Sequence, residues 1–375
     1  MFSTRFYWDT PPNRLTELLA EKRRAGARIL DLTESNPTRA GLAYPQEIVE
    51  AFGDLRILTY EPSPAGMLEA RQAVSEYYAA RGERVDPGRI LLTASTSEAY
   101  AYLFKLLADP GDEVLAPRPS YPLFEYLAGM ESLKVRQYRL AYHAGWSIDL
   151  DALSGEMSQR TRAVILVNPN NPTGSYVKRG ELGALQALCR ERGLALISDE
   201  VFSDYALEPN GERVALLAGD YSMSGLSKVA GLPQMKLGWI VAPEEAIGKL
   251  EWIADTYLSV GTPVQCAAAR LLAAGEDVQR QIRQRTAANL YFAREALAGS
   301  AANILAVEGG WYITVQAPRV RSEEEWTLEL LEHEDVLVQP GFFYDFEMEA
   351  FLVVSLLTPR EVFEAGMARI RRRVE

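Results

Sequence analysis

Histidine and cysteine are scarce in this sequence, which has two of each among 375 residues. Cys189 and Cys266 do not make a disulfide framework, so a reducing compartment is expected. His143 and His333 are too few for a histidine-based metal site or a Ser-His-Asp hydrolase, and we expect them on the surface or in packing roles. These shortages argue against a metalloenzyme and against a triad hydrolase, and no metal ligands are predicted.

Positive charge is also in short supply, because 39 Lys and Arg face 51 Asp and Glu, which gives a formal net charge of −12. This excess opposes phosphate backbones, so nucleic-acid binding would need a local basic stripe. The best candidate is the arginine cluster at positions 369 and 371–373. Cations complement the dipole at the end of a helix, so we expect the cluster to end a helix and expect no nucleic-acid partner.

Long hydrophobic runs are missing as well. Apolar stretches such as 163–167 have the length of a strand, and none approaches the roughly 18 to 20 residues that span a bilayer. The first residues, MFSTRFYWDTPPNR, lack a basic region followed by an apolar run, so no signal peptide is predicted. We therefore expect a cytoplasmic protein with no membrane partner.

Common nucleotide-binding and hydrolase motifs are absent or incomplete. Neither GxGxxG nor GxxxxGK(S/T) occurs, so nicotinamide and nucleotide binding are not supported. The segment 225–229 resembles a nucleophile elbow but lacks its second glycine and has no histidine nearby in the sequence.

What the sequence does contain is an alternation of strand-like and helical segments, typical of an α/β fold with a mainly parallel sheet. The strand-like segments are apolar on both faces, as buried parallel strands require. The expected strands are 89–92, 113–116, 163–167 and 195–197, and the expected helices between them are 97–108 and 179–192.

Two flanking regions differ from this core. The first 45 residues contain a predicted helix at 14–25 and a strand at 29–32, and the last third contains a long helical stretch, strands near 311–315 and 351–355, and a final helix. We predict a large domain over 46–262 and a small α+β domain built from 1–45 and 263–375.

Ligands of open α/β sheets bind at the carboxyl ends of the strands, and four polar turns follow predicted strands here. They are Thr93–Ser97, which opens a helix, the NPNNPTG turn at 168–174, SDEVF at 198–202, and YSMSGLSK at 221–228. A hydroxyl-rich helix start suits a phosphate, and the alternative is that Ser95 or Thr96 only caps the helix. Taken alone, each of the other turns has an ordinary structural explanation as well.

The order and spacing of the last three turns carry a resemblance. Asn171, Asp199 and Lys228 follow one another at 28 and 29 residues. With NPNNPTG, SDEVF and SGLSKVAGLPQMKLGW, the chain resembles the class I/II aminotransferases, the fold-type I enzymes that use pyridoxal 5′-phosphate, from about Leu32 to the final helix. The resemblance implies a three-layer α/β fold.

It also implies roles for the residues that match the family's motifs. Lys228 is the expected Schiff-base lysine, which then shuttles a proton at the substrate α-carbon; burial lowers the pKa of such an amine. Asp199 is expected to pair with the pyridinium nitrogen, and Asn171 to donate to the ring O3′. Tyr121 is expected to stack on the ring. The expected cofactor pocket also includes Ser95, Thr96, Ser97 and Lys236 at the phosphate, Phe202, Ser227, and Tyr60 from a neighbouring subunit, so a homodimer with shared active sites is implied.

Three positions depart from the family. Phe202 stands where tyrosine is usual, which removes a hydrogen bond to O3′ and should raise the pKa of the Schiff base. Lys236 stands where arginine is usual and meets the phosphate as a point charge. Val353 stands where an arginine usually clamps the substrate carboxylate. The candidates for that clamp are Arg39, in the loop with Asn36, and then Arg118; for each, a plain surface role is the alternative.

The leading hypothesis is an aminotransferase that moves an amino group from an amino acid to a 2-oxo acid. One alternative is a lyase or decarboxylase that uses the same cofactor on an amino acid, because the fold does not fix the reaction. A second alternative, from another class, is a non-catalytic module that binds pyridoxal phosphate.

Overall fold

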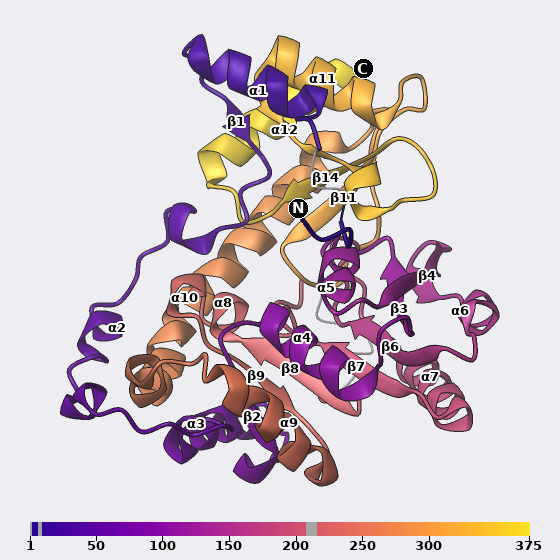
Figure 1. The fold of residues 1–375 in the computed structure, drawn as a ribbon. Coiled ribbons are helices and arrows are strands. Elements are labelled where there is room, and N and C mark those ends of the chain that lie inside the picture. Colours follow the sequence, from indigo (N-terminus) through magenta and orange to yellow (C-terminus); the bar gives the residue numbers. More distant parts are fainter. Residues whose placement is uncertain (1, 7–9, 208–215) are drawn as a thin grey trace.

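The computed structural model describes residues 2–6, 10–207 and 216–375, and its centre is an eight-stranded sheet (Figure 1). The strands from β8 through β7, β6 and β3 to β4 are parallel neighbours, while β9 and β5 run antiparallel to theirs. The predicted α/β fold with a mainly parallel sheet is confirmed. In spatial order the strands are β2 (Ile90–Thr93), β9 (Gly238–Val241), β8 (Tyr221–Gly225), β7 (Ala195–Asp199), β6 (Thr161–Val167), β3 (Glu113–Arg118), β4 (Lys134–Tyr142) and β5 (Trp146–Ile148).

Side chains of these strands are buried on both faces of the sheet. In β6, Ala163, Ile165 and Val167 pack toward one helical layer, while Val164 and Leu166 pack toward the other. This double burial explains the unbroken apolar runs in the sequence. One layer contains α4 (Thr96–Leu107), α5 (Phe124–Met130) and α9 (Glu244–Tyr257); the other contains α3 (Leu68–Ala79), α6 (Leu150–Glu156), α7 (Arg179–Arg192) and the first part of α10 (Thr262–Leu297).

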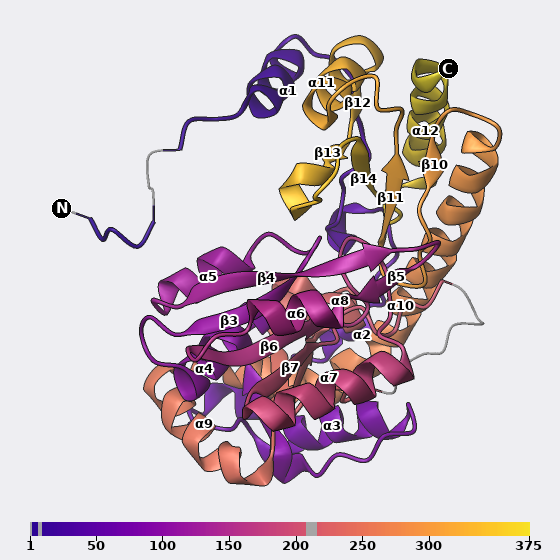
Figure 2. The same cartoon turned by 90° about the vertical axis from the view of Figure 1, so that its right-hand side faces the viewer.

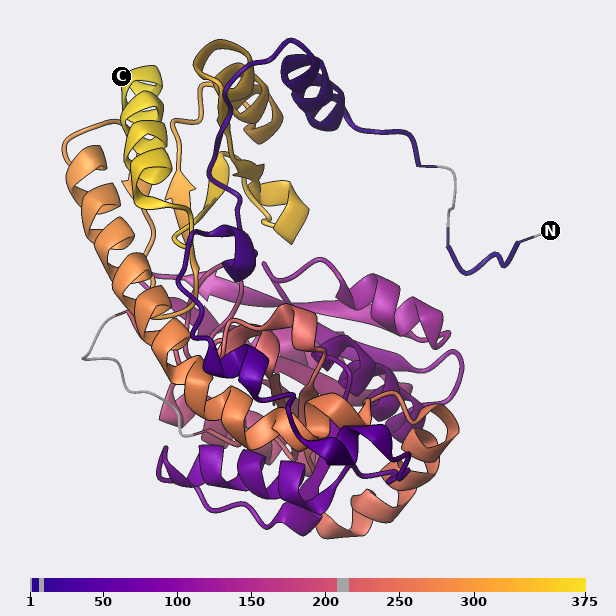
Figure 3. The same cartoon turned by 90° about the vertical axis from the view of Figure 1, so that its left-hand side faces the viewer.

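The other part of the molecule is assembled from both ends of the chain (Figures 1 and 3). Its four-stranded antiparallel sheet has the order β10-β11-β14-β13, and β1 pairs in parallel with β12. The 36-residue helix α10 packs on α3 and on α12, so it connects the two parts (Figure 2). The elements are α1 (Arg14–Arg24), β1 (Leu30–Asp31), β10 (Asn303–Ile304), β11 (Tyr312–Gln316), α11 (Glu323–Glu334), β12 (Val336–Leu337), β13 (Gln339–Pro340), β14 (Phe351–Ser355) and α12 (Arg360–Val374).

Predicted element boundaries differ from the observed ones by small amounts. α7 and β14 have the predicted bounds, whereas α4 begins and ends one residue earlier than predicted because Ser95 is its N-cap. The arginine cluster ends α12 as expected, and Arg372 and Arg373 pair with Glu334 and Glu329 of α11. The arginines therefore hold two helices together at this end.

Both cysteines are free thiols, and both histidines are exposed. Within the described residues, no group of histidine, cysteine and acidic side chains is arranged to hold a metal ion. No helix in that same part of the chain has the length and apolar character needed to cross a membrane.

Candidate functional site

One edge of the large sheet collects the carboxyl ends of β2, β3, β6, β7 and β8. A cavity of about 1130 Å³, its open mouth included, lies at this edge. Ten of the predicted site residues line it: Ser95, Thr96, Ser97, Tyr121, Asn171, Asp199, Phe202, Ser227, Lys228 and Lys236. The sheet topology therefore brings together residues up to 141 positions apart (236 minus 95).

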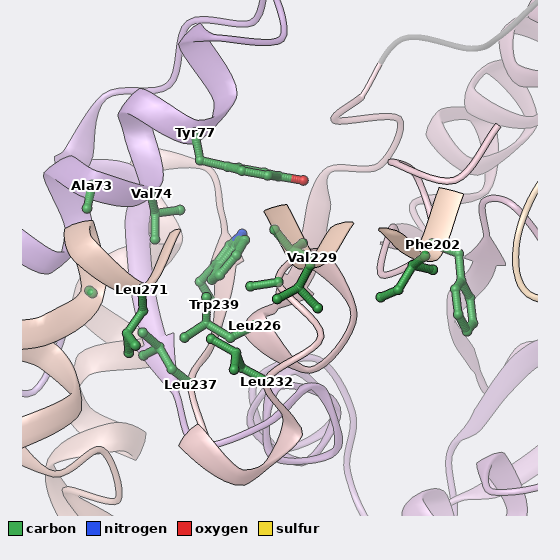
Figure 4. Close-up of a cluster of buried hydrophobic side chains, with 14 of the residues drawn as sticks. Ala73, Val74, Tyr77, Phe202, Leu226, Val229, Leu232, Leu237, Trp239 and Leu271 are labelled. Carbon is green, nitrogen blue, oxygen red and sulfur yellow. The ribbon is translucent and has the colours of Figure 1, made fainter. Parts of the chain in front are cut away.

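Lys228 projects from the short helix α8 (Leu226–Val229), which is anchored on both sides of the lysine. Leu226 and Val229 point into the buried cluster shown in Figure 4, where they meet Trp239. The side chain of Gln279 in α10 donates to the carbonyl of Val229 at 2.8 Å. The backbone around Lys228 is thus fixed by core packing, and its side chain is left to face the cavity.

The environment of Lys228 makes its side chain lose a proton at lower pH than an exposed lysine does. Burial lowers the pKa of the side chain to about 8, and the negative charge of Asp199 opposes this shift. A lysine with this pKa has an appreciable uncharged fraction near neutral pH, which a carbonyl-attacking amine requires.

Asp199 ends β7 and has both carboxylate oxygens occupied by donors. The Val201 amide donates to Oδ1 at 3.2 Å, and the Tyr100 hydroxyl donates to Oδ2 at 3.0 Å. Burial raises the pKa of Asp199 to about 6, while these two donors and then the charge of Lys228 act against the rise. The carboxyl is therefore mainly ionised at neutral pH in spite of its burial.

The turn after β6 uses two of its three asparagines for its own structure. Asn168 Oδ1 accepts from the Val177 amide at 3.1 Å, and Asn170 Oδ1 accepts from the Thr173 hydroxyl at 2.9 Å. The third, Asn171, lines the cavity, and its Oδ1 is buried with no hydrogen-bond partner among the described residues. Unpaired buried polar atoms are rare, so the Asn171 amide oxygen, a hydrogen-bond acceptor, marks a place for a polar ligand.

The hydroxyl-rich turn begins α4, a helix of twelve residues. Ser95 Oγ accepts from the Glu98 amide at 3.2 Å, so the capping role considered for Ser95 is observed. Thr96 and Ser97 line the cavity beside it, and Lys236, which has a left-handed backbone conformation with φ of 52°, lines the same cavity. A helix start, hydroxyl groups and one cation form a suitable environment for a phosphate group.

Aromatic rings form much of the remaining wall. Tyr121 is 44% exposed, whereas Phe202 is buried and packs edge-on against Trp311, with ring centres 5.2 Å apart. Phe202 presents only carbon atoms to the cavity it lines. Phe202 therefore does not supply the hydroxyl group that the family's usual tyrosine would place here.

The other predicted site residues lie elsewhere in this chain. Tyr60 is 77% exposed and lines a different cavity with Ser63 and Ser259. Asn36 caps a turn by accepting from the amide of Thr38 at 3.0 Å.

Neither arginine proposed as a carboxylate clamp lines the site cavity. Arg39 is exposed, and Arg118 is paired with Glu347, with Nη2 and Oε1 2.5 Å apart. Val353 is fully buried in β14, opposite Thr314 of β11.

Sequence reasoning missed three residues with polar side chains at the site. Ser35 and Tyr312 line the cavity from the terminal part of the chain, and Tyr100 lies behind Asp199. Ser35 stands in the ESNPT loop beside Asn36, so its place next to a predicted site residue was a usable signal. Tyr100 occupies a buried helix position that is indistinguishable in sequence from an ordinary core aromatic.

Solved structures define the class of this fold. The structure superposes on an alanine aminotransferase from Pyrococcus furiosus with a TM-score of 0.87 and 25% sequence identity. The superposition covers 100% of this chain and 99% of the Pyrococcus furiosus chain. A Thermus thermophilus aspartate aminotransferase single mutant gives the same TM-score and identity over 99% of both chains. The fold is that of the aminotransferases of fold type I.

Sequence comparison identifies the family. The family described as aminotransferase class I and II matches residues 27–370, so the chain belongs to it. Glutamate-pyruvate aminotransferase AlaA of Escherichia coli (strain K12) is 31% identical over 255 residues, which are 64% of this chain and 63% of that relative. The chain thus matches a little under two thirds of that relative's length. AlaA of Haemophilus influenzae is 26% identical over 91% of this chain and 89% of its own.

Proposed function

We propose that the protein is a pyridoxal-phosphate-dependent aminotransferase that moves an amino group from an amino acid to a 2-oxo acid. The observation that carries the proposal is a buried lysine with a lowered pKa, Lys228, in one cavity with Asp199, Asn171 and a phosphate-type helix start. Family membership and the names of the relatives support the same reaction.

The residues present fit this cofactor. Asn171 lines the cavity, where its side-chain NH2 can donate to a ring oxygen, and the start of α4 with Lys236 offers a cradle to a phosphate. Asp199 offers a carboxylate to a protonated ring nitrogen, and Tyr121 offers a ring face. When bound, the cofactor supplies a carbonyl carbon and an electron-accepting ring.

The remaining chemistry belongs to side chains of this protein. Lys228 would hold the cofactor through its side-chain nitrogen and, once released, would take the proton from the substrate α-carbon and deliver it to the former carbonyl carbon of the cofactor. Asp199 keeps a proton at the ring nitrogen. Ser95, Thr96, Ser97 and Ser227 bind near the phosphate, and Phe202 closes the wall with a carbon surface, so one polar contact at O3′ is absent compared with the family pattern.

Recognition of the substrate carboxylate is the part of the site that differs most from the family pattern. Of the residues that the structure describes, Lys228 and Lys236 are the only basic ones that line the cavity, and the cofactor would use both. Arg39 is the proposed clamp, because its loop supplies Ser35 to the cavity. Among the described residues, Arg39 has no side-chain hydrogen-bond or ion-pair partner, whereas Arg118 is held by Glu347. Asn36 is the proposed neighbour of the clamp.

The proposal includes a homodimer, two domains and a cytoplasmic location. The segment that ends at Tyr60 exposes Val49, Leu55 and Leu58 at 75%, 80% and 80%, an apolar surface that suits burial against a second copy. Tyr60 would then reach the partner's phosphate site. The proposed domains are 46–262 and 1–45 with 263–375, with α10 shared between them. Two free thiols are consistent with a reducing compartment.

The decisive experiment has two parts: it tests whether the cofactor is bonded to Lys228, and it identifies the reaction. Borohydride treatment of the loaded protein should fix the mass of the cofactor on the peptide that contains Lys228, and Lys228→Ala should remove it. A screen of amino-acid donors against 2-oxo acids should then show one amino acid formed per amino acid consumed. Release of a 2-oxo acid or of carbon dioxide without transfer would favour a lyase or a decarboxylase instead.

The homodimer has a separate test. Leu55→Asp combined with Leu58→Asp should give a monomer by sedimentation, because two buried charges oppose association. Leu15→Asp changes a leucine of α1, outside this segment, and should leave the oligomeric state unchanged. A wild-type monomer at micromolar concentration would contradict the shared active sites.

A further inference from the structure

Tyr100 makes a buried contact with Asp199 that none of the family motifs includes. Its hydroxyl donates to Asp199 Oδ2 at 3.0 Å, and the two residues are 99 positions apart. Tyr100 is 3% exposed and Asp199 is 9% exposed, so little water reaches the contact. A hydrogen bond to an ionised group in such a place is stronger than an ordinary one.

The ring of Tyr100 is held by its neighbours. The Phe124 ring packs edge-on against it with centres 5.5 Å apart, and the Phe104 ring lies 5.8 Å away. The same helix that begins with the hydroxyl-rich turn thus presents Tyr100 one turn later, toward the end of β7. Helix α4 therefore positions both the proposed phosphate site, at its start, and Tyr100, the hydrogen-bond partner of Asp199.

The direction of the hydrogen bond is fixed by the two pKa values. Burial, and next the negative charge of Asp199, raises the pKa of Tyr100 well above its usual range, so the phenol stays protonated and donates. Among the described residues, the titratable or charged side chains that interact with Asp199 are Tyr100 from α4, Lys228 from α8 and Tyr121 from the loop after β3. Only Tyr100 forms a side-chain hydrogen bond with it.

We propose that Tyr100 is a positioning residue that keeps the Asp199 carboxylate ionised and oriented toward the ring nitrogen of the bound cofactor. This inference rests on the proposed function. With Oδ2 tied to Tyr100 and Oδ1 tied to the Val201 amide, the carboxylate cannot rotate, and each oxygen keeps a second lone pair for another donor. Asp199 lines the cavity, so the cofactor meets a carboxylate already set in place.

The alternative is that Tyr100 only fills the core, and two measurements separate the roles. The first compares the stability of the full chain without cofactor for wild type, Tyr100→Phe, Asp199→Asn and the double variant. If Tyr100 acts on the charge of Asp199, then Tyr100→Phe should be more harmful at pH 8 than at pH 5, and its cost should shrink in the Asp199→Asn background. Equal costs at both pH values and in both backgrounds would overturn the proposal.

The second measurement is the dissociation constant of pyridoxal phosphate between about pH 5 and 7.5, a range that brackets the pKa of Asp199 near 6. Without the donor, the pH below which binding weakens should rise by about one unit, so that Tyr100→Phe binds about fivefold more weakly near pH 6, about tenfold more weakly near pH 5 and nearly normally at the upper end. An Asp199 titration unmoved by Tyr100→Phe would also overturn the proposal. A wild-type protein that does not bind the cofactor at all would instead overturn the proposed function, while the stability cycle still reports on Tyr100 and Asp199.

The matched control is Tyr138→Phe. Tyr138 is equally buried in β4, but its hydroxyl donates at 2.8 Å to a neutral acceptor, the carbonyl of Ile165. Loss of that hydroxyl should cost stability to a similar extent at both pH values and leave the pH dependence of cofactor binding in place. If Tyr138→Phe moves the binding curve as far as Tyr100→Phe does, the effect is general loosening of the core and the proposal fails.

Discussion

The side-chain nitrogen of Lys228 lies 5.0 Å from the centre of the Trp311 ring, and Trp311 is fully buried. An aromatic face attracts a cation, but loss of water around the nitrogen disfavours the charge more strongly, because the pKa of Lys228 is lowered to about 8. The ring therefore shields the amine from water and leaves it partly uncharged near neutral pH.

This balance can be measured on the chain without cofactor. Reductive labelling of Lys228 with a small aldehyde should rise with pH, with a midpoint near 8. In Asp199→Asn the midpoint should move to lower pH, because the negative charge of Asp199 raises the pKa of Lys228. Peptide mass spectrometry gives the rates, and the exposed Lys249 serves as the reference for reagent chemistry. The same midpoint in both proteins would show that the two groups are not coupled.

Burial of Asp199 should make the cofactor-free protein less stable as pH rises. Its pKa is raised from 3.8 to about 6, so between these values the unfolded chain loses the proton while the folded chain keeps it. Folding stability therefore falls through this window, and the full penalty, about 3 kcal/mol, is present above it. Asp199→Asn should remove the penalty and raise the free energy of unfolding more at pH 8 than at pH 4.5.

Urea unfolding at the two pH values checks this expectation. Asp255→Asn, at an exposed position of α9, should change stability by similar amounts at both. If Asp199→Asn instead lowers the free energy of unfolding at pH 8, then burial of the ionised Asp199 does not destabilise the cofactor-free protein. The same variant should lose aminotransferase turnover, since the ring nitrogen would no longer be held protonated.

The helix α10 comes unusually close to the turn that carries Lys228. A Cβ atom added at Gly275 would lie 2.3 Å from Ala230 Cβ, which is too close for any real contact. Gly275→Ala should therefore cost about 1 to 3 kcal/mol and, by displacing α8, weaken cofactor binding. Gly248→Ala in α9 meets nothing within 4 Å and should stabilise the protein by about 0.5 to 1 kcal/mol. Chemical denaturation of both variants is the test, and equal stabilisation would contradict the close approach.

Much of the site was predictable because short stretches of sequence show where each strand of the sheet ends. Apolar runs such as 163–167 fix buried strands, and each polar turn that follows a strand must lie at the carboxyl end of the sheet. The positions of Asn171, Asp199 and Lys228 in one cavity follow from that rule. Ser95 caps α4, which was one interpretation of its turn, and it also lines the cavity, where phosphate binding stays a prediction.

The missed residues depend on contacts that no local pattern encodes. Tyr100 lies on the buried face of α4 with Ala99 and Leu103, so its sequence pattern is that of any core aromatic. Ser35 reaches the cavity because its loop is fixed by the distant β14, where Ser355 Oγ donates to the Glu34 carbonyl at 2.6 Å. Pairings between residues hundreds of positions apart become visible only in the folded chain.

None of the arginines that the structure describes lines the cavity, and this leads to the last prediction. Val353 is fully buried, so it offers no charge to a substrate carboxylate, and Arg39 is the proposed replacement. Loss of a charge-assisted contact costs roughly 1.5 to 3 kcal/mol. Arg39→Ala should therefore raise the KM for amino-acid donors by about tenfold to hundredfold. Affinity for the cofactor should stay the same, because Arg39 does not line the phosphate end of the cavity.

Steady-state kinetics with several donors and acceptors measures this effect. Arg118→Ala is the matched control: it removes an arginine that is already paired with Glu347, so KM should change little. Arg39→Lys should restore part of the loss, since a point charge attracts a carboxylate without a bidentate fork. If Arg39→Ala has wild-type KM and Arg118→Ala does not, the carboxylate is held by Arg118 after its ion pair opens. If neither changes KM, substrates are recognised by the hydroxyls of Ser35 and Tyr312, and amines without a carboxylate should then react as well as amino acids.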